Sequence, residues 1–126
     1  MTRDVHVFLD ESAMVAAGRG SALVSRLIHR AHAEPDWFLY ATVCALVEAD
    51  RARPGTAEHI AALPGIAIVD LDLPAALSVA RANTWADAHT LYAAQPSPDR
   101  PDGAVIATTR PHTWKERSVR ILDVSP

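Results

Sequence analysis

The chain has 126 residues, nearly half of them apolar, and its 12 basic and 15 acidic side chains leave a net charge of −3. This composition predicts one globular domain over residues 1–126, without the basic excess that nucleic-acid binders often carry. A single cysteine, Cys44, excludes a disulfide framework and indicates a reducing, cytoplasmic compartment. No apolar run approaches the ~18 residues of a membrane span, so we expect no membrane partner.

The first predicted element is a buried strand over residues 5–9, which leads into Asp10 and then into small residues that can open a helix. Ser21 is expected to cap the next helix, because a hydroxyl there can accept from a free backbone N–H of the first turn. That helix ends before Pro35, since the residue preceding a proline disfavours helical backbone angles.

Residues 37–40 form a short apolar approach to a helix over about residues 41–53, which is apolar almost all round and therefore predicted to be buried. Thr56 is expected to cap a short helix that follows. A Pro-Gly turn then leads into a second buried strand, predicted over residues 66–70.

The second half of the chain continues the alternation of predicted strands and helices. A helix is predicted over residues 74–81, with a proline in the favoured first turn, and a second over residues 85–94, capped by Thr84. A proline-rich loop precedes two further strands, at residues 104–108 and 119–124. Short buried strands that alternate with helices predict an α/β domain of three layers, with a central parallel sheet of about four to five strands.

Two acidic residues are candidates for a site on chemical grounds. Asp10 would lie at the carboxyl end of a strand, where open α/β sheets bind their ligands, although an aspartate there can equally cap the following helix. Glu48 has small, uncharged neighbours at helical spacing, so its carboxylate needs a partner. That partner is either Arg51, three residues on, or a divalent cation.

A third candidate is Asp87, in the first turn of its predicted helix. With Thr84 it forms a capping-box pattern, yet helices in such folds begin at the ligand-binding edge of the sheet. Three carboxylates that reach one edge from separate segments would bind Mg²⁺ or Mn²⁺ through hard oxygen ligands. His89 lies two residues beyond Asp87, on a different side of the helix, and is expected to pack or face solvent.

These segments resemble a known family, the PIN-domain ribonucleases of the VapC toxin type. The resemblance covers essentially the whole chain and depends on the order and spacing of four pieces: an Asp-x-Ser-Ala opening after a strand, a helical glutamate, an aspartate helix, and a strand with its following turn. The pieces are residues 7–13, 43–51, 86–94 and 106–114.

The resemblance implies a PIN-like α/β/α fold and an Mg²⁺- or Mn²⁺-dependent endoribonuclease that hydrolyses RNA phosphodiester bonds. By matching position, Asp10, Glu48 and Asp87 would be the catalytic, metal-binding acids. The family also implies a homodimer and, for the toxin of a type II toxin–antitoxin pair, a cognate antitoxin that blocks the site.

One position departs from the family's pattern. A fourth Asp or Asn often stands two residues after the threonine that aligns with Thr108, and here that residue is Arg110. The exchange changes the fixed charge of the site by about two units and removes a ligand. One metal, an inactive site, or an arginine that holds a phosphate all remain open. Ser12 and Thr108 are expected either to hold the carboxylates by hydrogen bonding or to cap local structure.

Two alternatives to the nuclease follow from the residues. A degenerate PIN domain that binds RNA or a protein partner without cleavage is motivated by Arg110 and by the acidic net charge. A phosphoryl-transfer domain with Asp10 as nucleophile is the other, but the second aspartate expected two residues on is replaced by Ser12, and the one lysine, Lys115, is far from the predicted strand ends.

Overall fold

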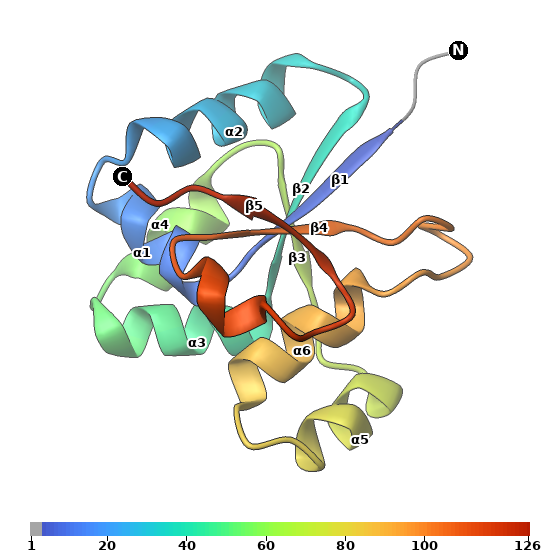
Figure 1. The fold of residues 1–126 in the computed structure, drawn as a ribbon. Coiled ribbons are helices and arrows are strands. Elements are labelled where there is room, and N and C mark those ends of the chain that lie inside the picture. Colours follow the sequence, from blue (N-terminus) through green and yellow to red (C-terminus); the bar gives the residue numbers. More distant parts are fainter. Residues whose placement is uncertain (1–3) are drawn as a thin grey trace.

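The computed structural model describes residues 4–126, in which five parallel strands form one sheet with the order β3-β2-β1-β4-β5 (Figure 1). The strands are β1 (Val5–Leu9), β2 (Trp37–Thr42), β3 (Ile66–Val69), β4 (Val105–Thr108) and β5 (Arg120–Asp123). The helices are α1 (Glu11–Gly18), α2 (Ala22–Ala33), α3 (Val43–Ala52), α4 (Thr56–Ala62), α5 (Leu73–Ala80) and α6 (Trp85–Ala94), with a 3₁₀ turn, η1 (Pro111–Trp114).

Strand β1 lies at the centre of the sheet and is buried on both faces. Val7 and Leu9 point into one apolar core, whereas Phe8 points into a second core on the opposite face. Side chains alternate along a strand, and a parallel strand covered on both sides is apolar throughout. The continuous apolar run that predicted this strand therefore corresponds to its central position.

Two layers of helices cover the sheet. The core that holds Val7 and Leu9 also contains residues of α1 to α4, and the core around Phe8 contains the end of α6 and Trp114 of η1. Helix α5 packs mainly on α6, at the outside of the second layer (Figure 1). The predicted three-layer α/β architecture with a parallel sheet is confirmed.

The register brings the ends of three segments to one edge of the sheet. Leu9, the last residue of β1, pairs with Ala107 of β4, and Thr108 pairs with Asp123 of β5. The residues that follow β1 and β4 therefore emerge side by side at the carboxyl edge. Asp10 and Thr109 are the first of them.

The prediction for residues 37–42 was wrong. Instead of an approach to a helix that starts at residue 41, these residues form β2, which pairs with β1 on one side and β3 on the other. The helix-like apolar pattern continues backwards from α3 into the strand, so it does not mark where the helix begins. The boundary is Thr42, whose extended backbone ends β2 and whose hydroxyl accepts from Ala45 N–H at 3.4 Å.

The predicted caps have different outcomes. Ser21 caps α2 as expected, by accepting from Val24 N–H at 3.3 Å. Thr84 precedes α6 but makes no capping hydrogen bond. Thr56 is the first residue of α4 rather than its cap, because Gly55 takes the capping position in the left-handed region, at φ 93°.

No helix within residues 4–126 is long and apolar enough to cross a membrane.

Candidate functional site

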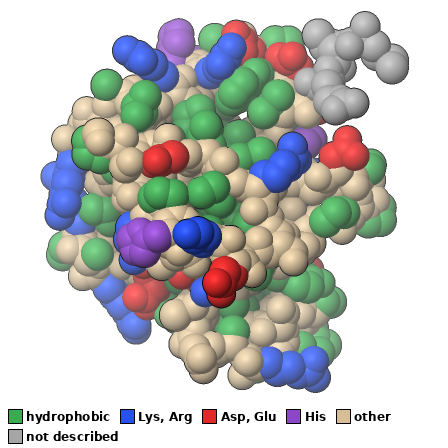
Figure 2. All heavy atoms as spheres, in the orientation of Figure 1, with side chains coloured by type: hydrophobic (Ala, Val, Ile, Leu, Met, Phe, Trp, Pro, Cys, Tyr) green, Lys and Arg blue, Asp and Glu red, His purple; other side chains and the backbone are tan. Residues whose placement is uncertain are grey.

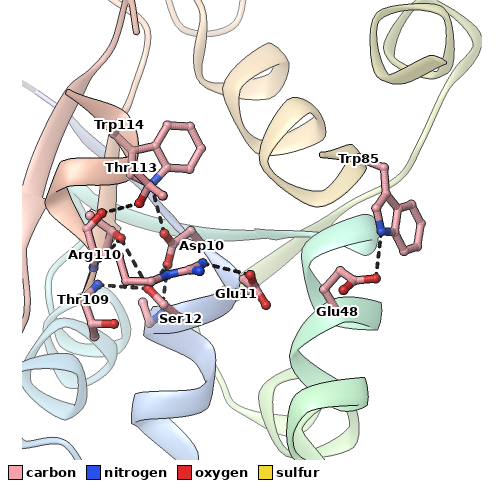
Figure 3. Close-up of polar contacts among 11 residues, drawn as sticks. Asp10, Glu11, Ser12, Glu48, Trp85, Thr109, Arg110, Thr113 and Trp114 are labelled. Carbon is pink, nitrogen blue, oxygen red and sulfur yellow. Dashed lines mark hydrogen bonds and ion pairs between the residues drawn. The ribbon is translucent and has the colours of Figure 1, made fainter. Parts of the chain in front are cut away.

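Asp10 is fully buried at the junction of β1 and α1. Its Oδ1 accepts hydrogen bonds from the Ala13 backbone N–H at 2.9 Å and from the Ser12 hydroxyl at 2.6 Å. Its Oδ2 accepts from the indole N–H of Trp114 at 3.1 Å (Figure 3). The helix cap that the sequence offered as an alternative is present, and both carboxylate oxygens are bonded to the protein itself.

Ser12 joins this carboxylate to the end of β4. Its hydroxyl oxygen accepts from the backbone N–H of Thr109 at 3.0 Å while donating to Asp10, and it lies 3.3 Å from the hydroxyl of Thr108. Thr108 in turn accepts from the backbone N–H of Arg110 at 2.9 Å. Ser12 thus links the carboxylate to the strand end, whereas Thr108 contacts Ser12 and the backbone that follows β4. Holding a carboxylate and capping local structure, the two roles left open by the sequence, both have contacts here.

Arg110 takes the place of the expected fourth acid and forms an ion pair there. Its Nη2 donates to Glu11 Oε1 at 2.8 Å, across 99 positions of sequence (Figure 3). The side chains are 40% and 25% exposed, so the pair is partly screened from water. The Nε of Arg110 is buried and has no hydrogen-bond partner among the residues that the structure describes. One donor of this guanidinium is therefore unsatisfied.

Asp87, in the first turn of α6, lies within electrostatic range of the same cluster. Burial raises the pKa of its carboxyl above the ordinary value of 3.8, and the negative charge of Asp10 raises it further. Arg110 and Arg117 lower the pKa, and Glu11 raises it, with smaller effects. Asp10 and Asp87 are therefore close enough for their charges to interact.

Glu48 does not join them. Its Oε1 accepts from the indole N–H of Trp85 at 2.7 Å and pairs with Arg51 at 3.2 Å. Figure 3 shows its side chain on α3, directed toward Trp85 and away from Asp10. The Arg51 partner that the sequence left open is present, on a side chain that is 71% exposed.

The residues do not fit a preformed Mg²⁺ or Mn²⁺ site in this arrangement. Across residues 4–126, no three His, Cys, Asp or Glu side chains are grouped so that they could hold a metal ion. Hard divalent cations need several oxygen ligands at once. Asp10 and Glu48 instead direct oxygens at the indole N–H groups of Trp114 and Trp85.

Sequence reasoning missed two residues of this site, Glu11 and Trp114, and it did not identify Trp85 as the partner of Glu48. The indole N–H of a buried tryptophan requires a hydrogen-bond partner, which gave a reason to look for an acceptor, but no spacing in the sequence links Trp114 to Asp10. Glu11 directly follows Asp10, and its role becomes visible only once Arg110 lies opposite it.

His89 is a packing residue, one of the two outcomes predicted for it. It is fully buried on α6, and its Nδ1 accepts from the backbone N–H of Cys44 at 3.5 Å. Burial lowers the pKa of its imidazole below the ordinary value of 6.5, so the ring is kept neutral.

These features define an α/β domain whose parallel sheet carries, at its carboxyl edge, a buried aspartate with three hydrogen bonds beside an arginine–glutamate ion pair. Searches of protein-family models and of curated proteins find no match to this chain.

Proposed function

We propose that the chain is a PIN-like domain that binds RNA at the carboxyl edge of its sheet and does not cut it with a carboxylate-held metal ion. The observation that carries this proposal is that the Asp10 carboxylate is buried and hydrogen-bonded within the protein. Its carboxylate has three donors inside the protein and no exposed surface. Because the carboxylate has no exposed surface, an ion could reach it only after neighbouring side chains such as Trp114 move.

The positive charge of Arg110 supports the same proposal. A guanidinium beside Asp10 and Asp87 supplies positive charge at the place where a nuclease of this kind would need its cation. Arginine also presents a planar set of donors that matches phosphate oxygens. The edge is therefore suited to contact an RNA backbone directly.

The distribution of charge on the surface favours a local contact with RNA over binding by a broad basic face. Figure 2 shows basic and acidic side chains interspersed over the face in view. With a net charge of −3, long-range attraction to RNA is absent, and the arginines at the sheet edge must provide the phosphate contacts.

The test is RNA binding and cleavage measured on the same samples. Fluorescence anisotropy with a labelled single-stranded RNA should give the same affinity in EDTA as in Mg²⁺ or Mn²⁺, and gels should show intact RNA throughout. Arg110→Gln should weaken binding about tenfold, the effect of losing one charge-assisted hydrogen bond. Arg26→Gln, on the exposed face of α2, is the matched control and should bind as the wild type does.

The proposal is overturned if the wild type cleaves RNA with Mn²⁺ and Asp87→Asn and Asp10→Asn do not. It is also overturned if RNA binds only when a divalent ion is present.

The second candidate is the metal-dependent endoribonuclease, the toxin of a toxin–antitoxin pair, which the resemblance implies. The repulsion between the charges of Asp10 and Asp87 favours it, because a cation bound by both carboxylates would relieve that repulsion. Its Mg²⁺ or Mn²⁺ cofactor, homodimer, antitoxin partner and cytoplasmic location remain predictions. Calorimetric titration with Mn²⁺ at millimolar concentration separates the two candidates, since only the nuclease requires binding.

A further inference from the structure

A pocket of about 580 Å³ opens between α1 and the start of α2, next to the Arg110–Glu11 pair. Gly20, at φ 83°, allows the turn that leads from one helix to the other. The chain end after β5 lies along the same opening (Figure 1). This volume falls within the range of small-molecule sites, about 300–1,000 Å³.

Two guanidinium groups line the pocket. Arg110 reaches it from the end of β4, and Arg19 from the end of α1. Arg19 is exposed and forms no ion pair within the part of the chain that the structure describes, and the Arg110 side chain is 40% exposed. The first turn of α2 also borders the opening and carries no acidic residue. The polar part of the pocket is therefore suited to an anion.

The remaining walls are mostly apolar, and they come from Val15, Ala16, Leu23 and Val124. Leu23 is 40% exposed, although it is a large apolar side chain. A ligand that fills this space needs an apolar body in addition to its negative group. A bare inorganic anion would leave these walls in water.

The acid in the pocket limits which anion can bind. Arg110 already has a carboxylate partner, Glu11, at 2.8 Å. Another carboxylate, or a phosphodiester, carries a single negative charge and therefore competes with Glu11 for Arg110 less strongly than a dianion does. A phosphate monoester carries a charge of about −1.5 to −2 at neutral pH and has three acceptor oxygens, so it can compete with Glu11 and engage Arg19 as well.

We propose that this pocket binds a phosphate monoester carried on a nucleoside, either the phosphorylated end of an RNA strand or a free nucleoside monophosphate. The phosphate contacts Arg19 and Arg110, and the nucleoside covers the apolar walls. This inference rests on the proposed RNA binding and adds to it a preference for a terminal phosphate over an internal one.

The experiment is a calorimetric titration with one RNA hexanucleotide in three forms, with a 5′ phosphate, with a 3′ phosphate and with neither, beside AMP and inorganic phosphate. At least one terminal phosphate should tighten binding fivefold or more. Arg19→Gln should abolish this increment, Arg26→Gln should keep it, and Glu11→Gln should enlarge it by releasing Arg110 from its partner.

Each outcome has a defined meaning. If the three hexanucleotides bind equally, RNA binding stands and this inference is wrong. If AMP binds and no hexanucleotide does, the pocket is a nucleotide site and the proposed RNA binding is wrong. If inorganic phosphate binds as tightly as AMP, the apolar walls play no part, and the assignment to a nucleoside is overturned.

Discussion

Two indole N–H groups donate to two of the candidate acids, Asp10 at the sheet edge and Glu48 on α3. Trp114 donates to Asp10 and Trp85 donates to Glu48, so each carboxylate is neutralised in part by a neighbouring side chain. A carboxylate that accepts such bonds in a buried place is costly to leave unpaired. The tryptophans therefore contribute to stability, and each takes one acceptor position of the carboxylate that it contacts.

Replacing Trp114 should show the first of these effects. Trp114→Phe removes the donor to the buried Oδ2 of Asp10 and leaves a small cavity, so we expect the free energy of unfolding to fall by about 2–4 kcal/mol. Urea denaturation followed by circular dichroism measures it. Trp37→Phe is the control, because Trp37 is less buried and its indole makes no hydrogen bond among the described residues. This change should lower the free energy of unfolding by about 1 kcal/mol or less. Equal costs for the two would contradict the role assigned to the Trp114 N–H.

Asp87 should make stability depend on pH in a direction opposite to that of most carboxylates. Its pKa is raised in the folded state, so its contribution to stability is full below the ordinary value of 3.8 and is lost as pH rises through the folded pKa. Asp87→Asn should consequently be more stable than the wild type at pH 7, and this advantage should disappear near pH 3. Urea melts of both proteins at the two pH values measure it. A wild type that is the more stable at pH 7 would contradict the prediction.

The sequence predicted part of this site because part of it is local. The cap made by Asp10 and the Glu48–Arg51 pair lie within three residues of their partners, and both were among the outcomes considered. The Trp114–Asp10 and Arg110–Glu11 contacts join residues about a hundred positions apart. No periodicity encodes such contacts, which depend on the order of strands in the sheet.

At the scale of the elements, the strands and helices that stand alone between turn signals were predicted, and β2 was not. This strand runs into α3 without an intervening loop. A single apolar stretch therefore contains both the two-residue periodicity of a strand and the ~3.6-residue periodicity of a helix. Tertiary pairing with β1 and β3 decides in favour of the strand. Only the capping geometry at Thr42 marks the boundary.

Thr42 and Thr84 provide a matched pair for testing this junction. Both precede a helix, but Thr42 is buried, caps α3 and lies 3.1 Å from the hydroxyl of Thr90 on α6, whereas Thr84 is exposed and makes no capping bond. We expect Thr42→Val to lower the free energy of unfolding by about 1–3 kcal/mol and Thr84→Val to change it by less than about 0.5 kcal/mol. Urea denaturation compares them, and similar losses in both would show that the cap is unimportant.

At the scale of the whole molecule, a bound ion would shift thermal unfolding by mass action. Under the proposed function, 10 mM Mg²⁺ or Mn²⁺ should change the Tm of the wild type by less than about 1 °C. Arg110→Asp restores the missing acid. If this variant binds the ion with a Kd about tenfold below the ion concentration, its Tm should rise by about 4 °C when the ion is added. Differential scanning calorimetry measures both. A clear rise in the wild type would favour the nuclease instead.

The central place of β1 bears on how the chain folds during synthesis. Its neighbour β4 and the indole of Trp114 are encoded about a hundred residues later. While the ribosome makes the intervening helices, β1 to β3 can pair, but one edge of β1 stays open and Asp10 lacks its indole donor, Trp114. The nascent protein therefore exposes an unpaired strand edge until almost all 126 residues have emerged, which makes this interval the one in which a chaperone would protect it most.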